Sequence, residues 1–135
     1  MRKKVSDETL LGLRLAPDML PFVKQIQIAC DTAKFAAARL SDTTAPKHDD
    51  NEKTLAELTT RIEETIAFIN SIPEAAFAHA SQKTIQLAYF PNPMSAEVYL
   101  LQFVAPNLYF HISTAYALLR SNGVDVGKTD YLGAI

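Results

Sequence analysis

The sequence predicts an all-α fold in which amphipathic helices pack as a bundle. Apolar residues recur at alternating spacings of three and four in three long segments, as they do along one face of a helix. The chain has only four glycines and is rich in Ala, Leu and Ile, which favours helix. A length of 135 residues suits a single domain, so we expect one bundle over residues 1–135.

The clearest predicted helix runs from about Asp18 to Leu40, and its Pro21 falls in the first turn, where backbone donors lack helical partners. Ile28 and Phe35 form a second apolar line, which is typical of a helix with a second neighbour. Before this long helix, the sequence is compatible with a short helix near Asp7–Arg14. The main seam of the long helix is Met19, Val23, Ile26, Cys30, Ala33, Ala37 and Leu40.

A second helix is predicted over about Asn51–Ile72, after a polar loop. Asp49 and Glu52 have the spacing of a capping box, and Pro73 ends the helix. Its inner face is predicted to be Leu55, Leu58, Ile62, Ile66 and Ile69, with Glu57, Glu63 and Glu64 on the solvated side.

The segment "KTIQLAYF" alternates Ile85, Leu87 and Tyr89 with polar or small residues, which is typical of a strand. A bundle offers a single strand no ladder partner, so we expect this segment to lie over the helices or to pair with another chain.

Ser95 is the expected N-cap of the last long helix, and Gly123 is well placed to end it in a left-handed conformation. Pro106 lies inside this helix and should bend it. The predicted seam is Leu101, Val104, Leu108, His111, Ala115 and Leu118.

The C-terminal stretch "NGVDVGKTDYLG" contains Gly-Lys-Thr but does not match a phosphate-binding loop. Gly123 and Gly127 are separated by three residues instead of four, and the segment follows a helix instead of a strand. We also expect too few residues after Gly127 for the helix that would hold a phosphate. The sequence instead predicts a structural tail that folds back on the bundle, with Lys128 paired near Asp130 and Val124, Val126, Tyr131 and Leu132 packing.

Composition narrows the possible functions. A net charge of −2 and a pI near 5.9 argue against a surface for nucleic acid or anionic membrane, and no apolar run is long enough for a membrane span. The single cysteine, Cys30, lies on an apolar seam and cannot form an internal disulfide, so we expect a buried thiol in a cytoplasmic protein.

His111 is the main candidate for chemistry, because it occupies a seam position where a leucine would be expected. Two interpretations remain open: a buried histidine whose ring nitrogens are satisfied by neighbouring groups, or a metal ligand or acid–base group facing the bundle interior. Ser113 lies two residues away and points in another direction, so it cannot pair with His111 as a nucleophile. His48 and His79 lie in connecting segments and are expected to be solvated, while the polar residues Arg14, Asp18, Gln25 and Arg39 are expected to make structural bonds.

Three segments together resemble a known family: "LRLAPDMLPFVKQIQIACDTAKFAAARL", "LAELTTRIEETIAFINSI" and "APNLYFHISTAYALLRSNGVDVGKTDYLG". They are similar to an uncharacterised family, a domain of unknown function, grouped with the DinB-like (YfiT-like) putative metalloenzyme bundles. The resemblance covers Arg14 to Gly133 and implies an up-and-down four-helix bundle, often a homodimer. Because only about a dozen residues precede "RLAPDM", the first helix is expected to be shortened.

The resemblance also implies where a metal would lie. Metal-binding members of the superfamily use one histidine from the second helix and two, spaced four apart, from the last. His111 matches one of the last-helix positions, whereas Ala115 and Asn107 stand four residues on either side of it, and residues 18–40 contain no histidine. Asp31 is a candidate oxygen ligand. His111, Asp31 and Asn107 are therefore the candidates for lining a pocket. We expect no cofactor, and the alternative is a divalent Zn, Ni or Fe ion.

Two functional hypotheses follow. The first is a dimeric small-molecule-binding or interaction module without a complete metal site, in which a second copy covers an apolar face exposed by the shortened first helix, with Ile28 and Phe35 as candidate lining. The alternative is a degenerate metal-dependent enzyme, in which a divalent ion at His111 activates a thiol or water nucleophile. The sequence does not decide whether the protein is an enzyme, and the ligand is unknown.

Overall fold

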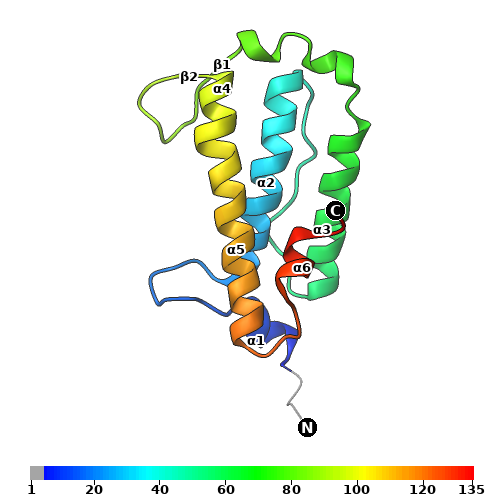
Figure 1. Cartoon of the computed structure of the whole chain (residues 1–135), viewed down its shortest axis with the longest axis vertical. Helices are drawn as coiled ribbons and strands as arrows, with labels where there is room; N and C mark the ends of the chain where they lie inside the picture. Colours follow the sequence, from blue (N-terminus) through cyan, green and yellow to red (C-terminus); the bar gives the residue numbers. More distant parts are fainter. Residues whose placement is uncertain (1–4) are drawn as a thin grey trace.

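The computed structural model describes residues 5–135 as an all-α bundle of three long helices with short elements at both ends (Figure 1), which confirms the predicted fold class. These helices are α2 (Phe22–Ser41), α3 (Leu55–Ser71) and α5 (Ala105–Ser121). Both α3 and α5 flank α2 and pack mainly on it, not on each other. The shortened first helix is α1 (Asp7–Leu11), which is capped by the Ser6 side chain and packs at one end of α2.

Helix α2 begins four residues later than expected. Pro21 is the cap residue and not part of the first turn, and residues 15–20 form a loop. The Arg14 guanidinium holds this loop by donating from Nη1 to the Met19 carbonyl over 2.6 Å. At its other end α2 stops at Asp42, whose φ of 55° lies in the left-handed region.

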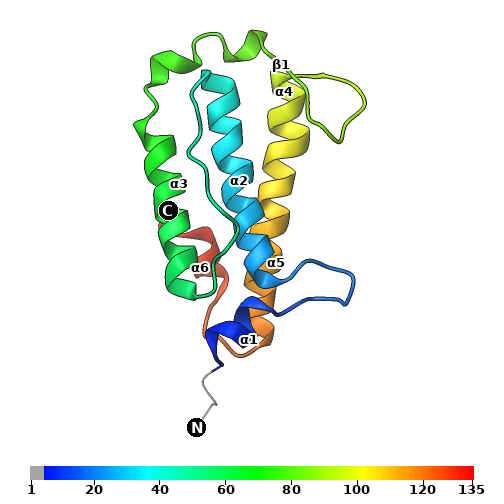
Figure 2. The same cartoon turned by 180° about the vertical axis from the view of Figure 1, so that it is seen from behind.

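Thr54 is the N-cap of helix α3, so the predicted Asp49–Glu52 capping box is wrong. The capping box is formed by Thr54 and Glu57, each of whose side chains accepts from the other residue's backbone N–H. Glu52 is unavailable as a cap because its carboxylate faces Arg61 of α3. The segment before α3, residues 42–54, runs back along α2 and α3 on the face shown in Figure 2.

The predicted strand has a partner inside the chain, contrary to expectation. β1 (Thr84–Ile85) pairs antiparallel with β2 (Met94–Ser95) in a two-stranded hairpin, with Thr84 opposite Ser95 and Ile85 opposite Met94. Tyr89, in the hairpin loop, is 71% exposed. Two short 3-10 helices, η1 (Glu74–Phe77) and η2 (Ala80–Gln82), connect α3 to this hairpin.

The last helix is continuous but changes its winding before Pro106. Ser95 caps its first turn as predicted, accepting from the Val98 N–H. Helix α4 (Ala96–Val98) passes into the π-helical segment η3 (Tyr99–Val104) and then into α5. A wider turn directly before Pro106 accommodates the proline ring and its missing N–H, which would disturb a regular α-helix.

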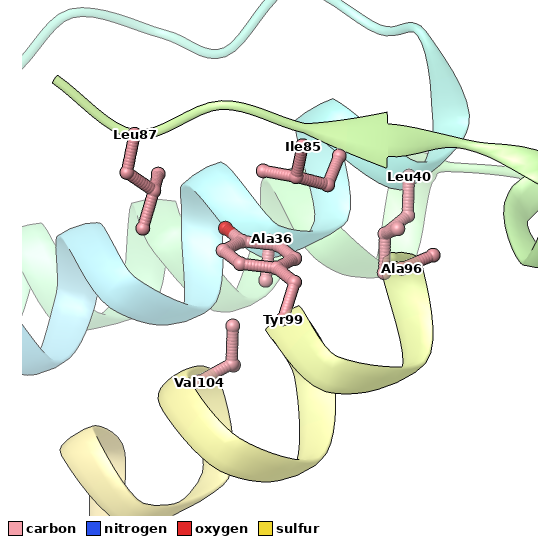
Figure 3. Close-up of a cluster of buried hydrophobic side chains, with 7 residues drawn as sticks. All are labelled: Ala36, Leu40, Ile85, Leu87, Ala96, Tyr99 and Val104. Atoms are coloured by element: carbon pink, nitrogen blue, oxygen red, sulfur yellow. The ribbon is translucent and has the colours of Figure 1, made fainter. Parts of the chain in front are cut away.

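Two apolar clusters hold the bundle together. The first joins the C-terminal half of α2 to the hairpin and to the start of the last helix (Figure 3), and the second joins α1 to the opposite end of α2, α3 and α5. The buried members of the first are Ala36, Leu40, Ile85, Leu87, Ala96, Tyr99 and Val104, and those of the second are Leu10, Leu11, Phe22, Leu58, Ala115 and Leu118.

The C-terminal tail folds back on the bundle, as the sequence predicts. Gly123 has a φ of 86° just after α5, and Val124 packs against the second apolar cluster. The tail contains the short helix α6 (Lys128–Leu132), for which we had expected too little room. Asp130 accepts the Gly127 backbone N–H over 2.7 Å, so this carboxylate caps α6 and its described contact is not with Lys128.

No helix in residues 5–135 is both long enough and apolar enough to cross a membrane.

Candidate functional site

A buried cluster of charged side chains joins α2, α3 and the segment of residues 42–54. Its centre is Arg61, whose side chain is only 2% exposed. Nη2 of Arg61 donates to Asp31 of α2 over 2.9 Å, and Nη1 donates to Asp50 and Glu52 over 2.8 and 2.9 Å. Gln27 donates to the same Glu52 carboxylate over 2.8 Å. A guanidinium with planar, fixed donors is suited to holding three carboxylates at once.

Lys34 extends this cluster toward His48. Its side chain is 2% exposed, and Nζ lies 3.2 Å from Asp31 Oδ1 and 3.1 Å from His48 Nδ1. Because an ammonium group can only donate, His48 Nδ1 must accept and Nε2 carries the proton that is donated to Glu64 over 2.9 Å. His48 is therefore a structural bridge between α2 and α3, and the expectation of a solvated loop histidine was wrong; His79 is exposed as expected.

Electrostatics within the cluster favours the charged forms. Burial alone would raise the pKa of Glu52, but hydrogen bonds from Arg61, the backbone and Gln27 hold that pKa below its usual range. Burial likewise opposes the charge of Arg61, and the bonded carboxylates of Asp50, Glu52 and Asp31 raise its pKa well above the ordinary value. The cluster is thus a set of paired ions that pins residues 48–52 to the bundle.

A cleft of about 300 Å³ opens beside this cluster. The charged groups at its base already bond to one another, so they offer a ligand few unused donors or acceptors. The cleft is lined by Lys47, His48, Asp49, Asn51, Glu52, Glu57, Thr60, Arg61 and Glu64.

An apolar groove of about 330 Å³ lies between α2, α3 and α5. It exists because α3 and α5 flank α2 without closing on each other. The open face between α3 and α5 is seen in Figure 1, where α6 lies across part of it. The groove is lined by Ile26, Ala29, Cys30 and Ala33 of α2, Ile62, Thr65, Ile66 and Ile69 of α3, and Leu108 and Ile112 of α5.

Several apolar residues that the sequence predicts on the inner faces of the helices line this groove and are not part of a closed core. Ile62 and Ile66, expected on the inner face of α3, are 37% and 53% exposed. Ile28 and Phe35, the candidate lining of the dimer face expected from the sequence, are not among the residues that line this groove, and that dimer face stays a prediction. Phe35 instead lies on the outer side of α2, where Lys34 and Arg39 approach its ring.

His111 is buried at the interface of α5 and α2. Its Nδ1 lies 2.6 Å from Gln25 Oε1, and the Gln25 amide donates in turn to the Leu20 carbonyl over 2.9 Å. The amide oxygen can only accept, so Nδ1 carries the proton and Nε2 keeps its lone pair. Burial lowers the pKa of His111, which favours the neutral ring.

The other pocket candidates lie elsewhere. Asn107 donates from its side chain to the Thr32 hydroxyl over 3.0 Å, which links α5 to α2. Asp31 bonds to Arg61 and Lys34, whereas His111 bonds to Gln25, so the structure does not place Asp31 beside His111. Across residues 5–135, no three His, Cys, Asp or Glu side chains gather where they could hold a metal ion. The residues around His111 do not supply the ligand set that a divalent metal requires.

The structural roles expected for several polar residues are confirmed. Arg14 and Gln25 bond to loop carbonyls, and Arg39 donates to the Tyr99 hydroxyl over 2.8 Å. Cys30 is buried, and burial raises the pKa of its thiol. The Arg61 cluster itself was not predicted. A signal for it exists in the sequence, since Gln27, Asp31 and Lys34, and also Glu57, Arg61 and Glu64, repeat at spacings of four and three.

Comparisons with known proteins agree with this architecture. Residues 1–132 match the model of a domain of unknown function, DUF1993. The crystal structure of a DinB family member protein from Shewanella denitrificans is 47% identical and superposes with a TM-score of 0.89, covering 95% of this chain and 74% of that one. A search of curated proteins found no match. The chain belongs to the DUF1993 family and has the fold of a DinB family protein.

Proposed function

We propose that this protein is a binding module, which uses the apolar groove between α2, α3 and α5 as its working surface and forms a homodimer. The observation that carries the proposal is the groove itself. Ten residues from three helices line it, none of them is charged, and two large side chains at its rim, Ile62 and Ile66, remain exposed. Apolar concave surfaces of this kind are the usual sites of small-molecule and protein binding.

Dimerisation has support from three large exposed side chains outside the groove lining. Leu101 of η3 and Tyr109 and Phe110 of α5 are 59%, 61% and 53% exposed. Large apolar and aromatic side chains are enriched in protein interfaces, and homodimers commonly bury them against a second copy. The same proposal places the protein in the cytoplasm, where the single thiol of Cys30 would stay reduced.

The alternative, a degenerate metal-dependent enzyme with zinc, nickel or iron at His111, has narrower support. The lone pair on His111 Nε2 is compatible with a metal ligand whose other nitrogen is held by Gln25. Within residues 5–135 no group of three His, Cys, Asp or Glu side chains could hold an ion, which favours the binding module.

Native mass spectrometry of the purified, tag-free protein tests both functions at once. The binding module predicts a dimer mass at micromolar concentration and a retained small molecule that is lost in Ile66→Glu. Ala67→Glu, which adds the same charge at the next exposed position of α3, should retain both. A bare monomer would contradict the proposal, and a stoichiometric metal ion that disappears in His111→Ala would support the enzyme instead.

A further inference from the structure

The apolar groove has no free polar group for a ligand. The two polar residues in its lining are Cys30 and Thr65. The Thr65 hydroxyl donates to the Arg61 carbonyl over 2.8 Å, and burial raises the pKa of the Cys30 thiol, which favours its neutral form. Both groups are buried, with exposed fractions of 7% and 4%. A charged or strongly polar ligand would therefore lose its hydration in the groove without gaining a partner.

The C-terminal tail contacts α5 next to one end of the groove. Ile112 lines the groove, and its neighbour Ser113 donates to the Tyr131 hydroxyl of α6 over 3.2 Å. One turn further along α5, the Tyr116 ring meets the Tyr131 ring edge-on at 6.1 Å. Figure 1 shows α6 lying between α5 and α3 on the open face of the bundle. Tyr131 is not one of the residues that line the groove, but it contacts α5 beside Ile112 and one turn beyond it, on the C-terminal side of the lining.

Helix α6 is more exposed to solvent than the long helices of the bundle. None of the residues of α6 is buried, and Leu132 is 50% exposed. The helix is five residues long and lies between Gly127 and Gly133, the latter with a φ of 73°. A segment with few buried contacts opens at lower free energy than a packed core helix, so the position of Tyr131 depends on its hydrogen bond with Ser113 and its ring contact with Tyr116.

From these contacts we propose that the groove binds an uncharged, apolar small molecule, and that Tyr131 forms an end wall that limits the length of this ligand. The inference rests on the proposed function of the groove as a binding surface and adds the ligand class and a specificity-determining residue. Shape supports it as well. Three of the four α2 residues in the lining are small, and isoleucine and leucine side chains of α3 and α5 face them across a space of about 330 Å³.

The ligand class is tested with two fluorescent probes that share their aromatic rings. N-phenyl-1-naphthylamine is uncharged, and 8-anilino-1-naphthalenesulfonate carries a sulfonate. We expect the uncharged probe to bind at least tenfold more tightly, and Ile66→Glu to weaken it at least tenfold while Ala67→Glu leaves it unchanged. Equal affinity for the two probes would overturn the ligand class. Binding that Ile66→Glu does not affect would overturn the site.

The end wall is tested by displacement of the uncharged probe with straight-chain alcohols of increasing length. Wild-type protein should show affinity that rises with chain length and then levels off, whereas Tyr131→Ala should extend the rise to longer alcohols. Ser113→Ala, which removes the hydrogen bond but keeps the ring, should lie between the two. An identical length profile in wild type and Tyr131→Ala would overturn the end wall and leave the binding function standing. Failure of any probe or alcohol to bind would overturn the binding function itself.

Discussion

The two faces that α2 and α3 share are built on opposite principles. On one face, the side chains of Arg61, Lys34 and Glu52 are buried, and the partly exposed Asp31 and Asp50 also bond to Arg61. On the other, the apolar groove lies open although its residues could form a core. Burying a cation costs free energy unless it is paired, and leaving an isoleucine exposed gives up hydrophobic stabilisation. The comparison separates a face of paired charges, which we expect to hold the fold, from an open apolar face, which is the proposed binding surface.

On α2 and α3, residues of the charged face are next to groove residues in the sequence. Gln27, Asp31 and Lys34 of α2 face the charged cluster, and each follows a groove residue by one position: Ile26, Cys30 and Ala33. On α3, Arg61 precedes Ile62 in the same way. Neighbouring residues of a helix point about 100° apart, so one helix can carry both surfaces side by side.

The largest expected effect is on the charged face. Arg61→Met removes the only described partner that joins Asp31, Asp50 and Glu52, and leaves carboxylates beside an apolar side chain. Because Asp31 and Asp50 are partly exposed, we expect a loss near the lower end for a broken buried ion pair, about 3 kcal/mol of unfolding free energy. Urea unfolding monitored by circular dichroism measures it. Glu63→Met, at an exposed position of the same helix, is the control.

A loss below about 1 kcal/mol for Arg61→Met, which is the range of an exposed ion pair, would show that the charged face does not hold the fold.

Acidification should have an intermediate effect, through the contact of α5 with α2. Burial lowers the pKa of His111 in the folded protein, so the unfolded chain takes up a proton at a higher pH than the folded one. The stability that His111 contributes is therefore complete above its ordinary pKa of about 6.5 and is lost as the pH falls below that value. The measurement is the melting temperature between pH 7.5 and pH 5.5 for wild type and for His111→Gln, which keeps a donor for Gln25.

His111→Gln should show the shallower decline over this range, because glutamine does not titrate. Parallel declines in the two proteins would mean that another group causes the pH dependence.

The smallest effect on stability is expected in the groove. Ile66 is 53% exposed, so Ile66→Glu should change the unfolding free energy by no more than about 0.5 kcal/mol. The same urea experiment measures it, with Ala67→Glu alongside. A loss comparable to that of Arg61→Met would show that the groove is part of the stabilising core in solution, as it would be if a tightly bound subunit covered it.

The sequence predicted the helices well because their apolar spacing is set by local geometry. It placed α2, α3 and the last helix, the Ser95 cap, the turn at Gly123 and the tail that folds back. It failed at contacts between distant segments. Asp49 and Glu52 have capping-box spacing, yet the competition for Glu52 is decided by Arg61, nine residues away. The partner of β1 lies across a loop, and residue spacing does not report it.

In the candidate site, too, local features were predicted and contacts between distant residues were not. His111 was singled out correctly as a buried histidine, but its partner Gln25 lies 86 residues away and no pattern indicates that pair. The groove between α2, α3 and α5 was not predicted, because apolar periodicity shows which residues share a face but not whether another helix covers that face. Lys34 and His48 were not recognised because charged and loop residues are usually solvated, and here a segment that folds back buries them.

The most direct test of the two-face account is an NMR titration of ¹⁵N-labelled protein with N-phenyl-1-naphthylamine. The account predicts that amide shifts gather at groove residues such as Ile26, Ile66 and Ile112, and at Tyr131, while Lys34, His48 and Arg61 stay unchanged. Shifts that gather around Arg61 and His48, with the groove unaffected, would contradict it and make the charged face the binding surface.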